Sequence, residues 1–491
     1  MIELVLFGTF LLCLFIGVPV SVSMGLSAFA TIIFTGGLKA LAPASSILYA
    51  GLSSETLLAI PFFILAGVIM ELTGISRRLV EFADACFGHM KNGIALTAIL
   101  VALIFSSISG SGPATVAAIG GILIPALAKH GYSKRHSAAL VATSGELGII
   151  LPPSIAYIVF AVVAADYAGP GVERVTIGRL FMAGVVPGLI LVVVLYLIAR
   201  FLPRDMELAK SNASAHLEHA MGKKGGVLAA ATGNGTVANV ADQGAVTTIE
   251  SSDGVTADAD EIGMRTKRAP MSVIFKAFLR ALPGLLVPVI ILGGIYGGIF
   301  TPTESAAVAS VYALVVGLFV TRDLKFKEVF KIFTSAGVMS GRIMLIIAAA
   351  TLFAYVITRN QIAKAVADWM LNLTDSVVLL VLIINLSLLI AGMFIDAISA
   401  FYLFIPLFVP VLLELGMDLT TIGVMMTMNL AIGLITPPVG IDLFVAAGIA
   451  RIPFGEAVKG IVPFVLSGIG VLMLVTFIPA ISNWLPDLLG L

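Results

Sequence analysis

The sequence predicts an all-α polytopic membrane protein built as an inverted structural repeat, with two re-entrant hairpins and two broken helices. Three observations predict this fold: a very apolar composition, a repeat between the two halves of the chain, and opposite charges in matching loops. Of the 491 residues, 59% are hydrophobic and only 11% are charged, whereas a soluble domain carries about 25% charged residues. Because so few charges cannot cover a soluble surface, we expect the protein to lie in lipid.

The charge balance and the motif content exclude several other classes of protein. Lys plus Arg and Asp plus Glu number 28 each, so nothing indicates a nucleic-acid partner. The two cysteines, Cys13 and Cys86, lie in or next to apolar segments and predict neither a disulfide framework nor a metal site. The sequence has no Gly-rich Walker loop and no Lys or His pair inside an apolar run, so neither an ATP-driven pump nor an intramembrane enzyme is expected.

Runs of about 20 apolar residues are long enough to cross a bilayer as helices. The predicted spans are 2–17, 20–35, 57–73, 137–168, 177–201, 279–299, 304–321, 332–358, 421–450 and 461–483. The first run lacks a basic region and a cleavage site, which predicts a helix and not a removed signal peptide. A polar stretch, 203–270, rich in Ala, Gly, Thr and Asp, divides the spans into two groups. We therefore predict a first repeat over 1–202, a polar cytoplasmic linker over 203–275 and a second repeat over 276–491.

The two groups of spans resemble each other in their Gly and Pro positions. An offset of 285 residues aligns 105–165 with 390–450 without a gap. Chance explains matching alanines and leucines in a membrane protein, but it does not readily explain a shared Pro-Pro pair with further Gly and Pro matches. The matched positions are Pro125 with Pro410, Gly131 with Gly416, Gly148 with Gly433, and Pro152-Pro153 with Pro437-Pro438. The simpler alternative is an old duplication whose halves only pack together.

The loop charges predict that the two repeats are inverted, because Lys and Arg mark the cytoplasmic side of short loops. The loop 129–136 carries Lys, Arg and His, whereas its counterpart 414–418 carries only acidic charges. The sides agree if 93–129 enters from the cytoplasm and 378–413 from the periplasm, each returning as a hairpin. That leaves about five spans in each half, with both termini outside. Inverted repeats with interrupted helices are typical of secondary transporters, whose substrate and ion sites lie near the midplane.

The tip of the first hairpin is a polar stretch inside an apolar run. Gly110 and Gly112 would permit the reversal, and Pro113 suits the first turn of the returning helix. The N–H groups freed there would attract an anion, and the freed carbonyls and hydroxyls a small cation. The alternative is a helix-packing face of small residues. The hydroxyl side chains of this tip are Ser106, Ser107, Ser109, Ser111 and Thr115.

Pro152 and Pro153 interrupt a long apolar run, because each removes an N–H donor from the helix. The carbonyls of 148–151 are then expected to be free near the midplane, where oxygen ligands would suit Na⁺ as they suit other hard cations. Glu146 lies at the same depth, where a charge is costly, and is therefore a functional candidate. It could equally be a protonated or paired side chain at a helix contact.

The second half offers equivalents at the same offset. Asp396 takes the place of Ser111, and Ser399 follows it in the tip. Asp396 could neutralise a Na⁺ or carry a proton, and it could also cap the returning helix; these roles are compatible. The second break contains, in order, Asn429, Gly433, Thr436, Pro437 and Pro438, with Asp442 one turn later.

Other charged residues in or near the spans have mainly structural interpretations. Arg342 could face an anionic substrate, but snorkelling to the cytoplasmic surface or an intramembrane pair is favoured. Glu304 stands where a helix begins, which favours a negative charge. The amphipathic segments near 77–91 and 359–368 predict interfacial helices that frame a moving unit or contact partners.

Several motifs resemble those of the large membrane subunit of tripartite ATP-independent periplasmic (TRAP) transporters. The resemblance covers essentially the whole chain outside the linker. Its motifs are Gly17-Val18-Pro19, Pro61-Phe62-Phe63-Ile64-Leu65-Ala66-Gly67, Gly148 through Ser154, Phe300-Thr301-Pro302-Thr303-Glu304, and Gly433 through Gly440. The 203–270 linker is longer than this family leads us to expect.

The resemblance implies a multi-pass permease of the bacterial or archaeal inner membrane that imports an organic acid anion by an elevator-like movement. Na⁺ would be the coupling ion, and no organic cofactor is expected. The implied partners are a periplasmic substrate-binding protein and a small four-helix membrane subunit, besides the surrounding lipid. We expect the small subunit as a separate chain because no four-helix unit precedes residue 1. The alternative is a stand-alone Na⁺- or H⁺-coupled carrier of organic anions.

Carried onto this sequence, the family pattern places one Na⁺ site between each tip and its break, with the substrate between the tips. The Na⁺ ligands would come from Ser106, Ser111, Gly148, Leu151, Pro152, Asp396, Asn429, Gly433 and Thr436. The substrate contacts would come from Ser107, Ser109, Gly110, Ser154, Ser399 and Thr436. Coupling or pairing roles would fall to Glu146, Arg342 and Asp442. Which tip hydroxyls touch substrate and which touch Na⁺ stays open.

Overall fold

The computed structural model of the chain describes residues 1–90, 92–168, 174–204 and 269–491. In these residues every regular element is a helix and none is a strand, which confirms the all-α fold class. Most of the predicted linker, 205–268, lies outside the described residues. Helix α12 begins at Met271, so the second half starts inside the stretch predicted as linker.

The helices follow one another with short connections in both halves. In the first half they are α1 (Ile2–Phe15), α2 (Val20–Gly36), α3 (Ala44–Leu52), α4 (Ala59–Leu72), α5 (Ile75–Phe87), α6 (Gly93–Ser109), α7 (Gly112–Lys129), α8 (Lys134–Ile150), α9 (Ile155–Ala164) and α10 (Ile177–Phe201). In the second half they are α12 (Met271–Tyr296), α13 (Pro302–Val315), α14 (Phe326–Arg359), α15 (Ile362–Leu371), α16 (Val377–Gly392), α17 (Ala397–Glu414), α18 (Leu419–Gly433), α19 (Ile441–Ala450), α20 (Phe454–Phe477) and α21 (Ala480–Leu488).

The spans agree with the apolar runs, although length alone does not separate spans from hairpin arms. In the described part of the chain, eight helices are long and apolar enough to cross a membrane, and the bent pair α8–α9, with 41° between its parts, would make a ninth. Two of the eight are α7 and α17, which are the returning arms of the predicted hairpins. Helices α3 and α21 were not expected from the sequence, because each is only 9 residues long.

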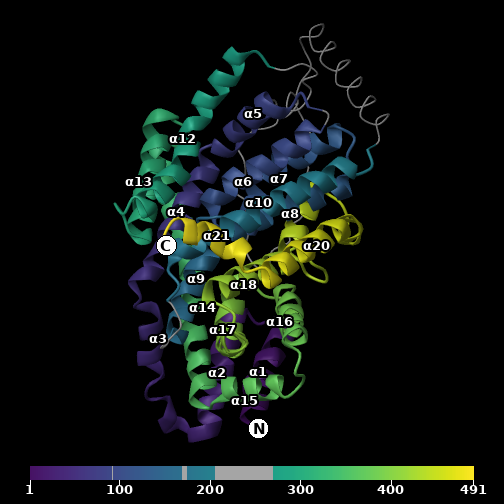
Figure 1. The fold of residues 1–491 in the computed structure, drawn as a ribbon. Helices are drawn as coiled ribbons and strands as arrows, with labels where there is room; N and C mark the ends of the chain where they lie inside the picture. Colours follow the sequence, from purple (N-terminus) through teal and green to yellow (C-terminus); the bar gives the residue numbers. More distant parts are fainter. Residues whose placement is uncertain (91, 169–173, 205–268) are drawn as a thin grey trace, which may run out of the picture.

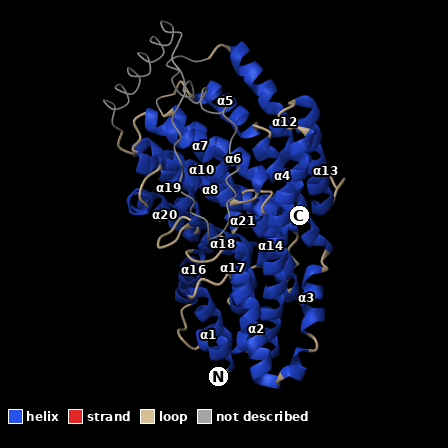
Figure 2. Ribbon diagram, turned by 180° about the vertical axis from the view of Figure 1, so that it is seen from behind, coloured by secondary structure: helices blue, strands red, loops and turns tan. Residues whose placement is uncertain are grey.

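The molecule is elongated (Figure 1). Helices α1, α2 and α15 lie at the end that carries the N-terminus, whereas α5 and the start of α12 lie at the opposite end. The view from behind shows the same arrangement, with α8 and α18 between the two ends (Figure 2). The amphipathic helices α5 and α15, which the sequence predicts as interfacial, therefore stand at opposite ends.

The helix boundaries of the two halves follow the offset of 285 residues. Moving α7 (Gly112–Lys129) by this offset gives 397–414, the bounds of α17 (Ala397–Glu414). The broken pair α8 and α9 corresponds in the same way to α18 and α19, and each start differs by at most one residue. Each half thus contains a helix hairpin followed by an interrupted helix.

The two halves exchange their short half-helices. From the first half, α9 packs against α17 and α18, and from the second half, α19 packs against α7 and α8. Each broken helix therefore ends inside the opposite half. In lipid such contacts form through close packing of small residues, because no hydrophobic effect drives helices together.

Glycines also permit close contacts between helices of the two halves. A Cβ built on Gly460 of α20 would lie 2.7 Å from the carbonyl oxygen of Arg135 at the start of α8. A Cβ built on Gly470 of the same helix would meet nothing within 4 Å. The two positions share a helix but differ in whether another backbone approaches.

We expect Gly460→Ala to destabilise the protein, because the new methyl group meets backbone that cannot rotate away. Overpacking of this kind costs roughly 1–3 kcal/mol, more than the gain of about 1 kcal/mol from better helix propensity. Gly470→Ala is the matched control and should be neutral or stabilising. Thermal unfolding in detergent, followed by size exclusion of the surviving fraction, measures both. Equal midpoints for the two variants would contradict the close contact of α20 with α8.

Candidate transport site

The reversal between α6 and α7 depends on a single glycine. Gly110 ends α6 with φ +63°, in the left-handed region that favours glycine. Ser111 follows with an extended backbone as the N-cap of α7, and Pro113 lies in the first turn as predicted. Gly112 has no positive φ, so the prediction that it also permits the reversal is wrong. Its missing side chain leaves room for Asp442 of α19, whose Oδ2 would lie 2.5 Å from a Cβ at Gly112.

The first tip packs directly against the first break. A Cβ on Gly110 would lie 3.2 Å from the carbonyl oxygen of Pro153. A Cβ on Gly148 would lie 2.9 Å from the carbonyl oxygen of Ser111 and 2.9 Å from Oγ1 of Thr115. The two backbones approach this closely because both glycines lack a side chain. The structure thus brings together Ser111 and Gly148, two of the residues that the family pattern assigns to the first Na⁺ site.

The hydroxyl groups of the first tip donate to nearby carbonyls of the same hairpin. Ser106 and Ser107 both donate to the carbonyl oxygen of Leu103, at 2.8 and 2.9 Å. Ser109 donates to the carbonyl oxygen of Ser111 at 3.4 Å. A hydroxyl oxygen that donates its proton keeps lone pairs. These hydroxyl oxygens therefore keep lone pairs to which a cation could bind.

The first break leaves fewer free carbonyls than the sequence predicts. The hydroxyl of Ser154 donates to the carbonyl oxygen of Ile149 at 2.5 Å, so this carbonyl is occupied. The carbonyl of Gly148 would have bonded to the N–H four residues later, but position 152 is proline and has none. Leu151 ends α8 in an extended conformation. Ser154 acts here as a substitute donor for the helix, which the sequence did not reveal.

The second tip carries a carboxylate where the first tip carries a serine. Asp396 is the N-cap of α17: it accepts hydrogen bonds from the backbone N–H of Ser399 at 3.2 Å and from the hydroxyl of Ser399 at 2.5 Å. The predicted capping role is therefore confirmed. The side chain of Asp396 is half-buried. Its charge lies at the positive end of the α17 dipole.

The second tip meets the second break through two glycines. A Cβ on Gly433 would lie 2.5 Å from the carbonyl carbon of Gly392, and a Cβ on Gly392 would lie 3.1 Å from Cα of Gly433. Both residues belong to the ends of helices, α16 and α18, that are expected to lie near the midplane. The second tip and its break are therefore also brought together, backbone against backbone.

Two asparagines link the hairpin to the interrupted helix in the second half. The amide nitrogen of Asn429 on α18 donates to Oδ1 of Asn385 on α16 at 2.5 Å, and to the carbonyl oxygen of Met425 at 3.0 Å. Oδ1 of Asn429 is buried and has no hydrogen-bond partner in the described residues. Thr436 donates to the carbonyl oxygen of Ile432 at 2.6 Å. The unpartnered oxygen of Asn429 is available to a cation.

The remaining charged candidates divide into buried and exposed groups. Glu146 on α8 and Asp442 on α19 are both fully buried, at 0% exposure. Their four carboxylate oxygens have no hydrogen-bond partner in the part of the chain that the structure describes. Arg342 is exposed on α14, which favours the predicted surface role over contact with a buried substrate. Glu304 forms a capping box with Thr301 at the start of α13, as expected for a structural residue.

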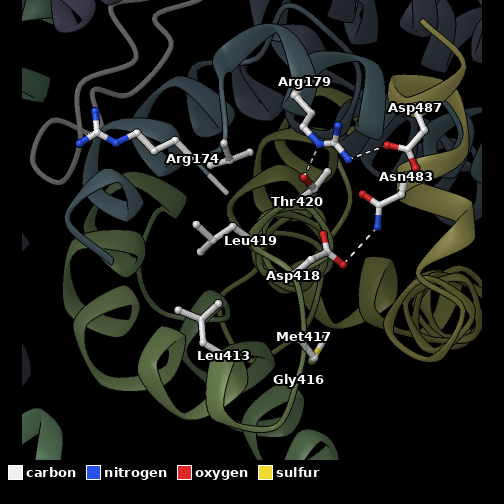
Figure 3. A pocket seen from close by; sticks show the side chains of 11 residues that line it. Arg174, Arg179, Leu413, Gly416, Met417, Asp418, Leu419, Thr420, Asn483 and Asp487 are labelled. Atoms are coloured by element: carbon white, nitrogen blue, oxygen red, sulfur yellow. Dashed lines mark hydrogen bonds and ion pairs between the residues drawn. The ribbon is translucent and has the colours of Figure 1, made fainter. Parts of the chain in front are cut away.

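A cavity of about 490 Å³ lies away from both tips, where α10 and α18 begin and α21 ends (Figure 3). Arg179 of α10 donates to Oγ1 of Thr420 at 2.9 Å and pairs with Asp487 of α21 at 2.7 Å. Asn483 of α21 donates to Asp418, the N-cap of α18, at 3.1 Å. The polar groups of this cavity thus fasten the C-terminal helix to the body of the protein.

Sequence reasoning missed Asn385, which links the second hairpin to its break, and the ion pair that fastens α21. Asn385 is a polar residue inside the apolar arm 377–392, a signal that could have identified it, because amides in such helices usually bond across to a neighbour. Arg179 and Asp487 lie 308 residues apart, and no sequence pattern pairs them. The fastening of α21 therefore needed the structure.

Comparison with known proteins decides the family. Residues 7–481 match the family described as "Tripartite ATP-independent periplasmic transporter, DctM component". The chain belongs to this family. It is therefore a TRAP transporter permease and a multi-pass protein of the inner membrane, and it comes from a family of transporters and not of enzymes. TRAP large permeases work with a substrate-binding protein and a small membrane subunit.

Several curated relatives are similar over most of the chain. The C4-dicarboxylate TRAP transporter large permease protein DctM of Pseudomonas aeruginosa is 38% identical over 89% of this chain and 87% of that protein. The DctM of Rhodobacter capsulatus, with the same name, is 34% identical over the whole of both chains. The sialic acid TRAP transporter permease protein SiaT of Haemophilus influenzae is 31% identical over 98% of this chain and 67% of that protein.

Two solved structures share the fold at low sequence identity. The YdaH transporter of Alcanivorax borkumensis superposes with a TM-score of 0.58 at 15% identity, over 93% of this chain and 89% of that one. MtrF of Neisseria gonorrhoeae superposes with a TM-score of 0.53 at 14% identity, over 92% and 85% of the two chains. Both likenesses concern the fold alone.

We expect Gly433→Ala to loosen the second tip from its break, because the new methyl group would lie 2.5 Å from the backbone of Gly392. Hydrogen exchange of the amides of 392–397 should accelerate, by about tenfold for each 1.4 kcal/mol of lost contact. Gly448→Ala on α19, where a Cβ meets nothing within 4 Å, is the control. Unchanged exchange in Gly433→Ala would mean that the tip does not depend on this contact.

Proposed function

We propose that this chain is the large membrane subunit of a Na⁺-coupled secondary transporter that imports an organic acid anion by an elevator-like mechanism. The observation that carries the proposal is that each hairpin tip packs, backbone against backbone, on a broken helix, once in each half of the chain. Irregular backbone at membrane depth is tolerated only where protein or a cavity covers it. In carriers built from inverted repeats, the substrate and ion sites are formed at interrupted helices of this kind.

The arrangement of the halves supports an inverted repeat. Their helix boundaries agree at one offset, their half-helices are exchanged, and the matched amphipathic helices α5 and α15 stand at opposite ends (Figure 1). An inverted repeat gives the protein two equivalent sets of contacts between its halves. A transporter can form one set when its site opens to one side of the membrane and the other set when its site opens to the opposite side.

The tips supply opposite charges for ion and substrate. The N-termini of α7 and α17 point their partial positive charge at the tips, which would favour a carboxylate of the substrate. Asp396 offers a negative charge, and Asn429 offers an unpartnered amide oxygen, for Na⁺. In the first half the hydroxyl oxygens of Ser106 and Ser111 and the carbonyl of Gly148 would take the corresponding role.

We assign the substrate to the C4-dicarboxylate class. Three of the curated relatives, including the two DctM proteins above, are named for C4-dicarboxylates. Others are named for isethionate and sialic acid, so the family name alone does not decide the class. The periplasmic binding protein and the small membrane subunit complete the proposed system. A stand-alone carrier is the second candidate, and it differs in needing no binding protein.

Uptake by reconstituted vesicles tests both candidates. Vesicles that contain this chain with its small membrane subunit should accumulate radioactive succinate only with an inward Na⁺ gradient and added binding protein. Uptake that is as fast without the binding protein would exclude the tripartite system and favour a stand-alone carrier. A thermal-shift screen of organic acids on the binding protein should rank C4-dicarboxylates first; stabilisation by another acid class alone would contradict the substrate assignment.

Asp396→Asn should weaken Na⁺ activation of transport while leaving the fold intact. Asparagine caps helices about as well as aspartate, so the substitution removes the charge and keeps the cap on α17. We expect the half-saturating Na⁺ concentration to rise by about tenfold or more, equivalent to 1.4 kcal/mol. Ser109→Ala and Ser111→Ala should have smaller effects, because each removes one neutral ligand.

The control for this series is Glu414→Gln, which changes an exposed carboxylate at the other end of α17. Its Na⁺ dependence should equal that of the wild type. If Asp396→Asn retains wild-type Na⁺ activation, Asp396 has no part in coupling, and its role is limited to capping.

A further inference from the structure

The most unusual buried groups in the described residues are two carboxylates that face no cation. Glu146 lies on α8 of the first half and Asp442 on α19 of the second half, and both are fully buried. A Cβ built on Gly145, the neighbour of Glu146 in α8, would lie 3.2 Å from Oδ2 of Asp442. No ion pair or hydrogen bond of the described residues involves their side-chain oxygens. A buried charge without compensation costs several kcal/mol, so each of these carboxyl groups either keeps its proton or binds a cation.

The charged groups of the surrounding helices do not provide a positive partner for the pair. Helices α6, α7, α10, α18, α19 and α20 pack against α8, and α7 and α20 also pack against α19. Helices α6 and α18 contain no ionisable side chain. The other neighbouring helices have their ionisable side chains toward their ends, apart from Tyr196 on α10. The ionisable groups on or directly beside α7, α8, α10, α19 and α20 are Lys129, His130, Lys134, Arg135, His136, Arg179, Tyr196, Arg200, Arg451, Glu456 and Lys459, besides the pair itself. Lys134 begins α8 about 18 Å along the helix from Glu146, at 1.5 Å per residue.

Two glycines let α7 and α8 approach Asp442 closely. A Cβ on Gly112 would lie 2.5 Å from Oδ2 of Asp442. A Cβ on Gly145 would lie 3.2 Å from the same oxygen, 3.1 Å from the carbonyl oxygen of Gly112 and 2.4 Å from Cγ2 of Val116. A carboxylate oxygen and a backbone carbonyl oxygen are therefore close to the residue that precedes Glu146, with the side chain of Val116 packed against them. The first turn of α7, which starts at Gly112, adds a partial positive charge beside Asp442.

We propose that Glu146 and Asp442 form a further Na⁺ site, distinct from the two sites at the tips and breaks. Its ligands are the two carboxylates and the carbonyl oxygen of Gly112. Such an all-oxygen set suits a hard cation. No group of three or more His, Cys, Asp or Glu occurs in the described chain, so a transition metal that prefers nitrogen and sulfur ligands is not favoured.

The site extends the proposed Na⁺ coupling, on which its role in transport rests. Asp442 belongs to the second half, whereas Glu146 and Gly112 belong to the first half. A cation between them would hold α19 against the first tip and α8. Its occupancy would therefore contribute to the contact between the exchanged half-helix of one repeat and the hairpin of the other.

Equilibrium binding of radioactive Na⁺ to the full chain in lipid nanodiscs tests the proposal without any transport substrate. Glu146→Gln, Asp442→Asn and the double variant should each bind one Na⁺ per chain fewer than the wild type at a fixed pH. Glu414→Gln, an exposed carboxylate, is the matched control and should bind as many as the wild type. A pair that takes only protons, or nothing, would leave the Na⁺ count unchanged in all variants, and this result would overturn the proposal.

A second variant keeps both carboxylates and serves if the charge variants fail to fold. Gly112→Ala directs a methyl group at Oδ2 of Asp442, and we expect it to weaken the Na⁺ affinity of one site by about tenfold, equivalent to 1.4 kcal/mol. Gly448→Ala, which meets nothing within 4 Å, should leave all affinities unchanged. Wild-type affinities in Gly112→Ala would contradict the site. Failure of succinate transport would overturn the proposed function but leave these Na⁺ counts unaffected.

Discussion

Lipid offers no hydrogen-bond partner to a peptide group, and this constraint decides where the chain can be irregular. The two Pro-Pro breaks remove helical donors at membrane depth, so other parts of the protein must cover them. Each is covered by the tip of a hairpin from its own half, and glycines let the backbones approach. Ser154 and Thr436 supply hydroxyl donors to the carbonyls of Ile149 and Ile432 that precede the breaks. The candidate ion sites are therefore the same places at which the fold must satisfy its own backbone.

The charges follow the same constraint. Ion pairs such as Arg78 with Asp323 and Arg179 with Asp487 are partly exposed at helix ends, where water reduces the cost of an ionised side chain. Asp396 is half-buried and has two hydrogen bonds from Ser399. Glu146 and Asp442 are fully buried, and their carboxylate oxygens accept no hydrogen bond from the described residues, which is why we propose them as a cation site. Structural charges have an ion pair or hydrogen bonds, whereas this buried pair lacks them in the described residues. This difference separates the two kinds of charge better than burial alone does.

Much of the fold could be predicted because the signals are local or repeated. Pro152-Pro153 and Pro437-Pro438 identify the breaks, and Gly110 identifies the reversal, since each acts through its own backbone. The role of Gly112 could not be predicted, because the reason for it is Asp442, which is 330 residues away in the chain. The bond between Asn385 and Asn429 joins two separate helices, and the fastening of α21 joins segments 308 residues apart. Sequence periodicity contains no information on which faces of apolar helices meet, so the partners of buried polar groups required the structure.

The packing of the helices divides the protein in a way that suits the proposed movement. One group contains α1, α2, α3, α4, α12, α13 and α14, which pack on one another, and the other contains α6 to α10 and α16 to α21. The two groups also touch directly, chiefly where α14 packs against α17 and α4 against α6. Helix α5 packs against α12 of the first group and α6 of the second, and α15 packs against α14 and α17 in the same way. These two amphipathic helices stand at opposite ends of the molecule (Figure 1). Hinges at both ends would allow the second group to shift as a body in the proposed movement, and the tips and breaks, which lie wholly within it, would keep their contacts with one another.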